Sequence, residues 1–532
     1  MSSIAEDKER RVVPRWRYIR TNNASQEGMG LPKREHRSDD SSSRFLQQKV
    51  SDWKRNRTPG GAIDLLCSYS NGVPSAEARE AASWLLDEQS VPMTRHVELV
   101  ARSVLEDGRM IAEETPDVHL PPLLLNTRSS SIEHIRHTKR RLDDDPRSSL
   151  AWLDLARSYT ILGQNGHAER AVRAATNLAP NNRQVLRSAS RFYLHIDRPD
   201  LAHSLLQDNP RTPRDPWLLA AELAVAQVAG KGPRFYKVGK RLVEAKSFAP
   251  EYLTELHSAL GMLELRSGSV RAARKNLRAS LLRATENSVA QARWASTQIA
   301  GIDITEEAYS LPSNYEARCW RYLQSESWSD AASQCVGWIL DEPYSARPAL
   351  VGSFIGLMLV EEPQMSAKFA QAGLSSSPHS AMLRNNLTVA HAYCGNLEAA
   401  FREFSAIPFP LPIDLPRYTC IATAGLLYFR TGDIRRGREL YQASERIAPN
   451  SAKSVVRLFR LREEIEAATP LARELLEAEK KIVQKEDDSY RKRMMYLIEA
   501  NLRSRDKKHV IPISIGENIH YDRATNIIHR LL

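Results

Sequence analysis

Proline recurs along this chain at an interval close to 34 residues, and that spacing limits the folds the chain can adopt. One series, with gaps of 34, 33 and 37 residues, is Pro146, Pro180, Pro213 and Pro250. A second, with gaps of 35, 34 and 37 residues, is Pro343, Pro378, Pro412 and Pro449. One helix–turn–helix unit of a repeat solenoid has this length, and proline suits its end because it cannot continue the preceding helix. The spacing therefore predicts an all-α helix-turn-helix repeat solenoid.

The pattern is most complete in residues 149–182. Large residues share one face of the first predicted helix at helical spacing: Trp152, Leu155, Ala156 and Tyr159. A glycine at the turn, small residues along the second helix and a final proline follow in order: Gly163, Ala168, Val172, Ala175 and Pro180. This unit resembles the tetratricopeptide repeat (TPR) family, because the large residues, the small residues and the proline all fall in register. The resemblance implies a TPR-like superhelix.

Less complete copies extend the resemblance over residues 132–451, about three-fifths of the chain. We expect two sub-arrays, 132–287 and 312–451, separated by an irregular connector at 288–311 where the register is lost. The ends should differ in kind. We expect a disordered basic arm at 1–44, a non-repeat helical block at 45–131, and C-terminal capping helices and a short tail at 452–532. The main capping helix is predicted from Leu471 to about Arg503, with a break near Asp487-Asp488.

The sequence favours binding over catalysis. It contains no phosphate-binding loop, no H-E-x-x-H motif and no G-x-S-x-G motif, so no catalytic, cofactor or metal residue is predicted. The resemblance implies a groove, lined by the first helix of each unit, that holds an extended peptide or a partner helix. Arg384 and Asn385 near the start of one first helix are candidate groove residues. The alternative is that they are ordinary solvated side chains.

Positive charge is concentrated in two places. The chain carries a net charge of +11: residues 231–283 hold +8, residues 1–60 hold +6, and the rest of the chain holds −3. The first cluster falls on second helices of neighbouring units and predicts a basic stripe for nucleic acid or an acidic protein. The alternative is a solvated face compensated by acids from elsewhere. Its candidate residues are Lys231, Arg234, Lys237, Lys240, Arg241, Arg271, Arg274, Lys275 and Arg278.

The N-terminal cluster interleaves arginines with aromatic residues in RRVVPRWRYIR at 10–20. Arg15, Trp16 and Arg17 are its candidate binding residues, because arginine and tryptophan together grip nucleic acid by charge and stacking. Two alternatives remain open. The segment is either an arm that orders on a protein partner or a solubilising tail.

The remaining features concern location and partners. No apolar run is long enough to span a bilayer and the N-terminus lacks a signal sequence, so we expect a cytoplasmic protein without membrane attachment. The five cysteines are scattered and are predicted to be small buried residues, Cys394 among them. The leading hypothesis is a scaffold or adaptor for a separate protein. A nucleic-acid-binding component or sensor is the alternative, and the oligomeric state stays open.

Overall fold

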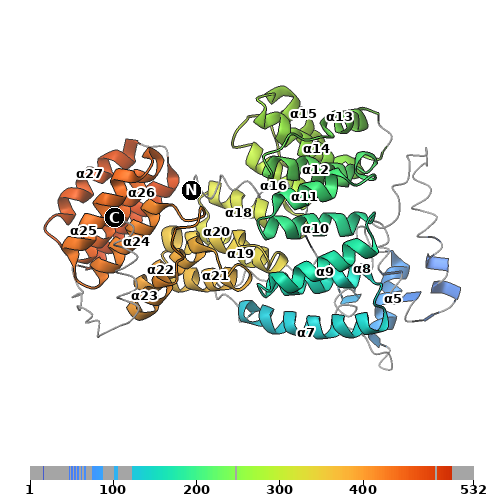
Figure 1. The fold of residues 1–532 in the computed structure, drawn as a ribbon, viewed down its shortest axis with the longest axis horizontal. Helices are drawn as coiled ribbons and strands as arrows, with labels where there is room; N and C mark the ends of the chain where they lie inside the picture. Colours follow the sequence, from blue (N-terminus) through green and yellow to red (C-terminus); the bar gives the residue numbers. More distant parts are fainter. Residues whose placement is uncertain are drawn as a thin grey trace. The chain divides into compact units, whose positions relative to one another are not determined.

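The computed structural model describes Trp16, parts of residues 47–66, residues 75–87, 101–102 and 104–105, and residues 123–245, 248–485 and 488–505. Every regular element in these residues is helical (Figure 1), which confirms the all-α prediction. The chain forms two compact units, residues 32–119 and residues 1–31 with 120–532. The predicted arm, apart from Trp16, and the predicted tail lie outside the described residues.

The smaller unit contains helix α5 (Ala76–Asp87). The small side chains of Ala78, Ala81 and Ala82 are buried with Leu85, and this apolar face packs with Trp53 and Leu65. The indole rings of Trp53 and Trp84 meet edge to face, with centroids 5.4 Å apart. Of the predicted helical block at 45–131, the described residues include α5 and the first part of α7 (Leu123–Asp144). The boundary of the unit lies at 119/120 rather than 131/132, because α7 packs on the first repeat.

The larger unit is a succession of antiparallel helix pairs, each packed on the next. The first sub-array contains α8 (Ser149–Ile161) with α9 (Asn165–Leu178), α10 (Arg183–His195) with α11 (Pro199–Gln207), α12 (Pro216–Val228) with α13 (Tyr236–Glu244), and α14 (Pro250–Arg266) with α15 (Val270–Leu281). A short 3-10 turn, η1 (Thr212–Arg214), precedes α12.

The second sub-array continues the same arrangement. Its pairs are α18 (Tyr315–Gln324) with α19 (Trp328–Asp341), α20 (Arg347–Ile355) with α21 (Pro363–Ser376), α22 (Ala381–Tyr393) with α23 (Leu397–Ser405), α24 (Arg417–Arg430) with α25 (Ile434–Ile447), and α26 (Asn450–Glu466) with α27 (Ala472–Lys485). A π-helical turn, η2 (Gly356–Val360), extends α20. The last helix is α28 (Ser489–Arg505).

The residues that carried the repeat prediction form the interior. In the first unit, Leu155, Ala156, Ala168, Val172 and Ala175 are all nearly or completely buried. Burying a side chain of leucine or valine size contributes about 1.5–3 kcal/mol, and the alanines let the two helices approach closely enough to bury it. This pattern is confirmed.

A residue in the left-handed backbone region marks the turn inside every helix pair. These residues are Gly163, Asp197, Gly230, Gly268, Gly301, Glu326, Glu361, Gly395, Gly432 and Ala468. The region 288–311 forms a shortened pair. Its first helix, α16 (Glu286–Ala295), packs on α14, α15 and α18. A turn at Gly301 leads to its second helix, α17 (Glu306–Tyr309), which has four residues. Ala468 shows that the array runs on to Lys485, past the predicted end at 451.

Candidate interaction surfaces

Trp16, near the N-terminal end of the chain, packs against the first helices α8 and α10 of the first sub-array. The Trp16 ring is 1% exposed and packs on Phe192 of α10 and on Tyr344, which follows α19. The Trp16 amide donates to the Tyr344 hydroxyl at 3.0 Å, and its carbonyl accepts from Arg157 Nε at 3.0 Å. Trp16 is therefore unavailable for stacking on a base in this arrangement, whereas Arg15 and Arg17 lie outside the described residues.

Helix α28 packs against α26, α27 and η2 of the second sub-array. The Tyr490 ring packs against Trp328 and Phe354, with centroids 5.6 and 6.4 Å away. Arg493 Nε donates to the Leu359 carbonyl of η2 at 2.9 Å, and Met494 is buried in the same core. The break between α27 and α28 agrees with the predicted one. However, α28 does more than cap the last pair, because it also packs on η2.

The two candidate groove residues are engaged within the array. Arg384 Nη1 donates to Glu403 Oε2 at 2.9 Å, and its Nη2 donates to the Pro378 carbonyl at 3.0 Å. The Asn385 side chain is buried, with 3% of the residue exposed. Neither side chain is turned fully to solvent. The binding role of these two residues stays a prediction.

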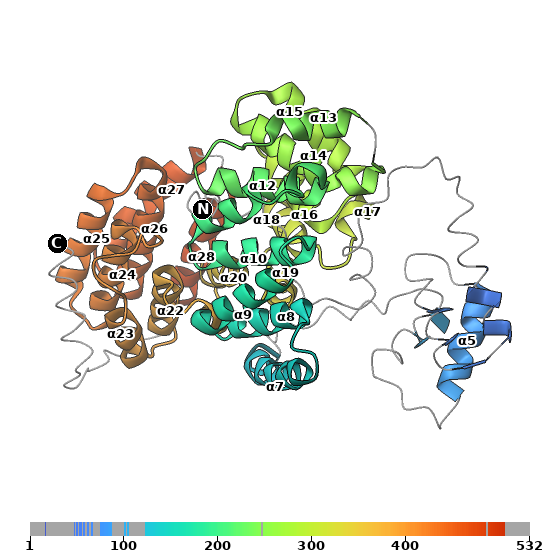
Figure 2. The ribbon, with the colours of Figure 1, turned by 45° about the vertical axis from the view of Figure 1, so that its right-hand side comes forward.

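Seven of the nine candidate residues lie on second helices, whereas Lys231 and Arg234 lie in the loop before α13. Helices α13 and α15 both pack on α14 and lie side by side in both views (Figures 1 and 2). Seven of the nine candidates are exposed: Lys231, Arg234, Lys237, Arg241, Arg271, Lys275 and Arg278. We call α13 and α15 with these residues the basic surface.

Several of these cations also form ion pairs or hydrogen bonds with neighbouring segments of the array. Lys231 Nζ is 2.6 Å from Asp200 Oδ1, which joins the start of α11 to the loop before α13. Arg274 and Arg278 donate to the carbonyls of Ala300 and Gly301 at 2.8 and 2.7 Å. Lys240 lies 3.7 Å from Glu264, and its pKa is raised by Tyr236 and by that carboxylate. The charge that stays turned to solvent therefore comes mainly from Lys237, Arg241, Arg271 and Lys275.

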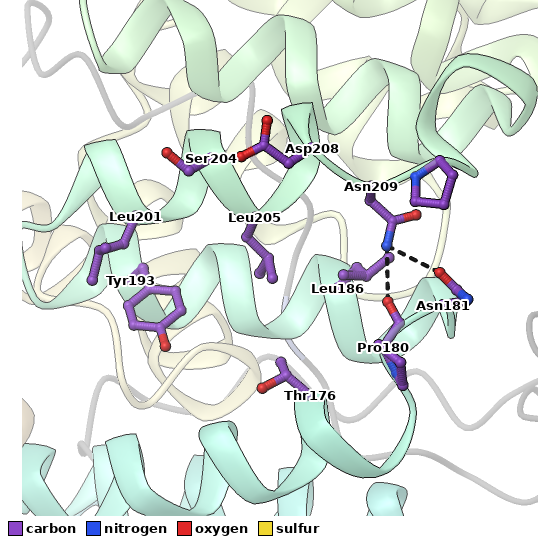
Figure 3. A pocket seen from close by; sticks show the side chains of 11 residues that line it. Thr176, Pro180, Asn181, Leu186, Tyr193, Leu201, Ser204, Leu205, Asp208 and Asn209 are labelled. Atoms are coloured by element: carbon purple, nitrogen blue, oxygen red, sulfur yellow. Dashed lines mark hydrogen bonds between the residues drawn. The ribbon is translucent and has the colours of Figure 1, made fainter.

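An apolar cleft of about 540 Å³ opens beside the basic surface, between the second helices α9 and α11 (Figure 3). Its floor is the α10 side chains Leu186 and Tyr193, and α11 contributes Leu201 and Leu205. Asn209 closes one end, where its amide donates to the Pro180 carbonyl at 2.8 Å. Figure 3 shows the leucines and the tyrosine ring turned toward the same space, with polar groups at its edge.

The edge of the cleft near Tyr193 carries charged groups of both signs. Burial is the main cause that raises the pKa of the Tyr193 phenol, with Glu169 adding to it, while Arg173 and Arg198 act in the opposite direction. Both arginines are exposed. The phenol therefore stays protonated at neutral pH and can donate a hydrogen bond to an acceptor bound there.

This cleft was not predicted from the sequence. Leu201 and Leu205 have the spacing of an ordinary second helix, and the gap depends on how far α11 lies from α9.

Other chemistry is sparse in the described part of the chain. No group of three or more potential metal ligands comes together among the residues described. Cys319, Cys335 and Cys420 are buried as predicted, but Cys394 is exposed, since it forms the C-terminal cap of α22 instead of facing its packed side. In these same ranges, no helix has the length and apolar character to cross a membrane.

Comparison with known proteins adds little detail. No protein-family model and no curated protein sequence matches the chain. Among solved structures, the chain is similar to the crystal structure of yeast Tom70, with 11% sequence identity and a TM-score of 0.28 over 88% of this chain and 97% of that one. A likeness this distant identifies neither a family nor a partner.

Proposed function

We propose that the chain is a protein-interaction scaffold of the tetratricopeptide-repeat type, which holds a separate partner protein in the cytoplasm and catalyses no reaction itself. The observation that supports it best is the apolar cleft between α9 and α11 next to the exposed cations of the basic surface. An apolar hollow near exposed cations can anchor one apolar side chain of a partner and select that partner by charge.

The second-helix surface is the better candidate for the partner because the first-helix faces are partly occupied. Trp16 lies against α10, and α28 lies against η2 and α26. A partner that docked at those places would have to displace part of this chain. The cleft and the basic surface are open without any rearrangement, and the Lys231–Asp200 pair shows that they adjoin.

The charges define the partner's chemistry. A large apolar side chain of the partner can lie over Leu201 and Leu205 in the cleft. Carboxylates on either side of it in the partner's sequence then lie near Arg173, Arg198 or the basic surface. We therefore propose that the partner presents an acidic segment with at least one large apolar side chain. Attraction of this kind acts mostly on the association rate and weakens as salt rises.

The test is selection of binders from a random peptide library displayed on phage, against the full chain. Enriched peptides should be acidic and contain an aromatic residue or leucine. Reversing the exposed charges by Lys237→Glu, Arg241→Glu, Arg271→Glu and Lys275→Glu should weaken their binding by about tenfold or more, as expected for loss of several close charge pairs. The separate change Leu201→Asp should weaken binding, because it places in the cleft a carboxylate that repels the carboxylates of an acidic peptide.

A matched control keeps the same change in net charge on the second sub-array: Arg402→Glu, Arg446→Glu, Lys481→Glu and Lys485→Glu, all at exposed positions. This variant should bind the selected peptides like the unmodified chain. Equal losses in both variants would overturn the proposal. Binding of single-stranded RNA with a steep salt dependence, lost only in the first variant, would favour the nucleic-acid alternative instead.

A further inference from the structure

The pocket that holds Trp16 is built by residues distant in sequence. Its two hydrogen-bonding residues, Arg157 and Tyr344, lie 141 and 328 positions along the chain from Trp16. Phe192 and Tyr344 are completely buried with Trp16 in place, and they form two walls around its ring. Among the described residues, the array supplies the walls and the hydrogen-bonding groups of this pocket, and the Trp16 ring fills it.

The contacts are those of a bound peptide. The main-chain N–H and C=O of one residue are both engaged by side chains of the array, while its ring enters an aromatic hollow. Main-chain hydrogen bonds fix the direction of an extended segment, and a pocket for one side chain selects its sequence. The Trp16 ring meets Phe192 edge to face, with an interplanar angle of 76° and centroids 6.2 Å apart, a favoured arrangement for aromatic pairs.

The pocket is also charged in a defined way. The guanidinium groups of Arg157 and Arg191 lie over the Tyr344 ring, 5.6 and 5.4 Å from its centroid. Burial and Arg191 lower the pKa of His195 to about 3, so its ring beside Tyr344 is neutral. Two cations at a tyrosine face favour a neutral aromatic guest and a carbonyl acceptor, and they disfavour a basic side chain in the hollow itself.

We propose that this pocket is a binding site for an extended peptide segment bearing a tryptophan, and that the chain's own Trp16 segment is its resident ligand. A partner segment of the same chemistry binds when it displaces Trp16. The site lies on the first-helix face, so it is distinct from the cleft and the basic surface. Arg157 of α8 also donates to the Asp341 carbonyl of α19 at 3.2 Å. The pocket that holds Trp16 therefore lies where the first sub-array meets the second.

The test uses a fluorescently labelled peptide with the sequence of residues 10–20, RRVVPRWRYIR, and the full chain. The tethered segment competes at high effective concentration, so the peptide should bind the Trp16→Ala chain at least about tenfold more tightly than the unmodified chain. A peptide of identical charge, RRVVPRARYIR, should bind the Trp16→Ala chain at least about tenfold more weakly. Adding Tyr344→Phe to the Trp16→Ala chain should cost about fivefold in affinity for the tryptophan peptide.

Equal binding of the two peptides would overturn the proposal, since charge alone would then explain the affinity. Equal binding by the unmodified and Trp16→Ala chains would also overturn it. A second measurement does not depend on that variant folding. In hydrogen exchange of the unmodified chain, the Trp16 amide should exchange slowly, and Tyr344→Phe should speed it up by removing its acceptor. Exchange of that amide at the rate of an open peptide in the unmodified chain would sink the idea.

Discussion

A buried carboxyl supports the turn that leads into the basic surface. Glu222 of α12 is completely buried, and it accepts the Arg234 amide at 3.1 Å. Its Oε1 also lies 3.5 Å from His203 Nε2, and burial is the main cause that lowers the pKa of this histidine. Burial raises the pKa of Glu222 to about 7, more than the hydrogen bonds from Arg234 and Phe235 lower it. The folded chain therefore holds a proton here that an unfolded chain would release.

The raised pKa of Glu222 makes the folded chain less stable as pH rises. The folded pKa lies above the ordinary 4.5, so the stability gained from the bound proton is complete below that pH and is lost as pH rises toward 7. We predict that the free energy of unfolding of the unmodified chain falls by about 3 kcal/mol between pH 5 and 8 relative to Glu222→Gln, which cannot ionise. Urea unfolding at the two pH values measures the difference.

The exposed Glu244→Gln on α13 is the matched control and should keep the pH dependence of the unmodified chain. The same pH dependence in Glu222→Gln and in the unmodified chain would show that Glu222 is ionised in the folded state, contrary to this account.

At the scale of the element, two glycines let α24 and α25 pack closely. A methyl group on Gly437 would lie 2.6 Å from a Phe429 ring carbon and 2.9 Å from the Gly425 carbonyl oxygen. The structure shows that a hydrogen atom is all the space allows.

Gly437→Ala should therefore destabilise the chain. Overpacking costs typically about 1–3 kcal/mol, and the roughly 1 kcal/mol that alanine gains in helix propensity only partly offsets it. Gly166→Ala in α9 has the opposite expected sign, because no atom lies within 4 Å of the new methyl group and propensity alone decides. Thermal unfolding of the pair measures both, and a stabilised Gly437→Ala variant would show that the two helices separate easily.

How far the sequence predicts the elements depends on the kind of signal. Proline spacing and apolar faces located the helix pairs, and Pro250 differs only in opening α14 rather than closing the previous unit. The pair at 286–309 was missed because its second helix has only four residues, too few for a periodic pattern. Periodicity reports which face of a helix is buried, but not what covers it. The places of α28 and Trp16 depend on contacts across hundreds of residues, so the sequence could not show them.

The candidate site divides in the same way. The repeat register places most of the basic candidates on the neighbouring second helices α13 and α15, but Lys231 and Arg234 lie in the loop before α13. The bonds of Arg274 and Arg278 to the carbonyls of residues 300 and 301 were not predictable, because the shortened pair brings that turn against α15. Tryptophan among arginines suggested stacking on bases, but the same chemistry suits a pocket of aromatic rings within the array.

At the scale of the larger unit, contacts between the sub-arrays depart from a simple solenoid. In such an array each repeat touches only its neighbours, so a local change stays local. Here α21 packs on α7 and α8. The turn after α8 meets the end of α21, because a methyl group built on Gly163 would lie 3.1 Å from the Ser375 carbonyl oxygen and 3.3 Å from Pro378 Cδ. The two sub-arrays should therefore influence each other's stability.

Alanine variants of two glycines distinguish coupling between the sub-arrays from ordinary backbone strain. Gly163 and Gly395 occupy the same turn position in their pairs, with φ of +69° and +76°, and no atom lies within 4 Å of a methyl group on Gly395. Alanine at either position costs about 1 kcal/mol for its left-handed backbone. Gly163→Ala should also push against α21, so hydrogen exchange should quicken in both α8 and α21. Gly395→Ala should quicken exchange only in α22, α23 and the adjoining pairs. If Gly163→Ala leaves α21 unchanged, the sub-arrays are energetically independent and the contact between them contributes little to stability.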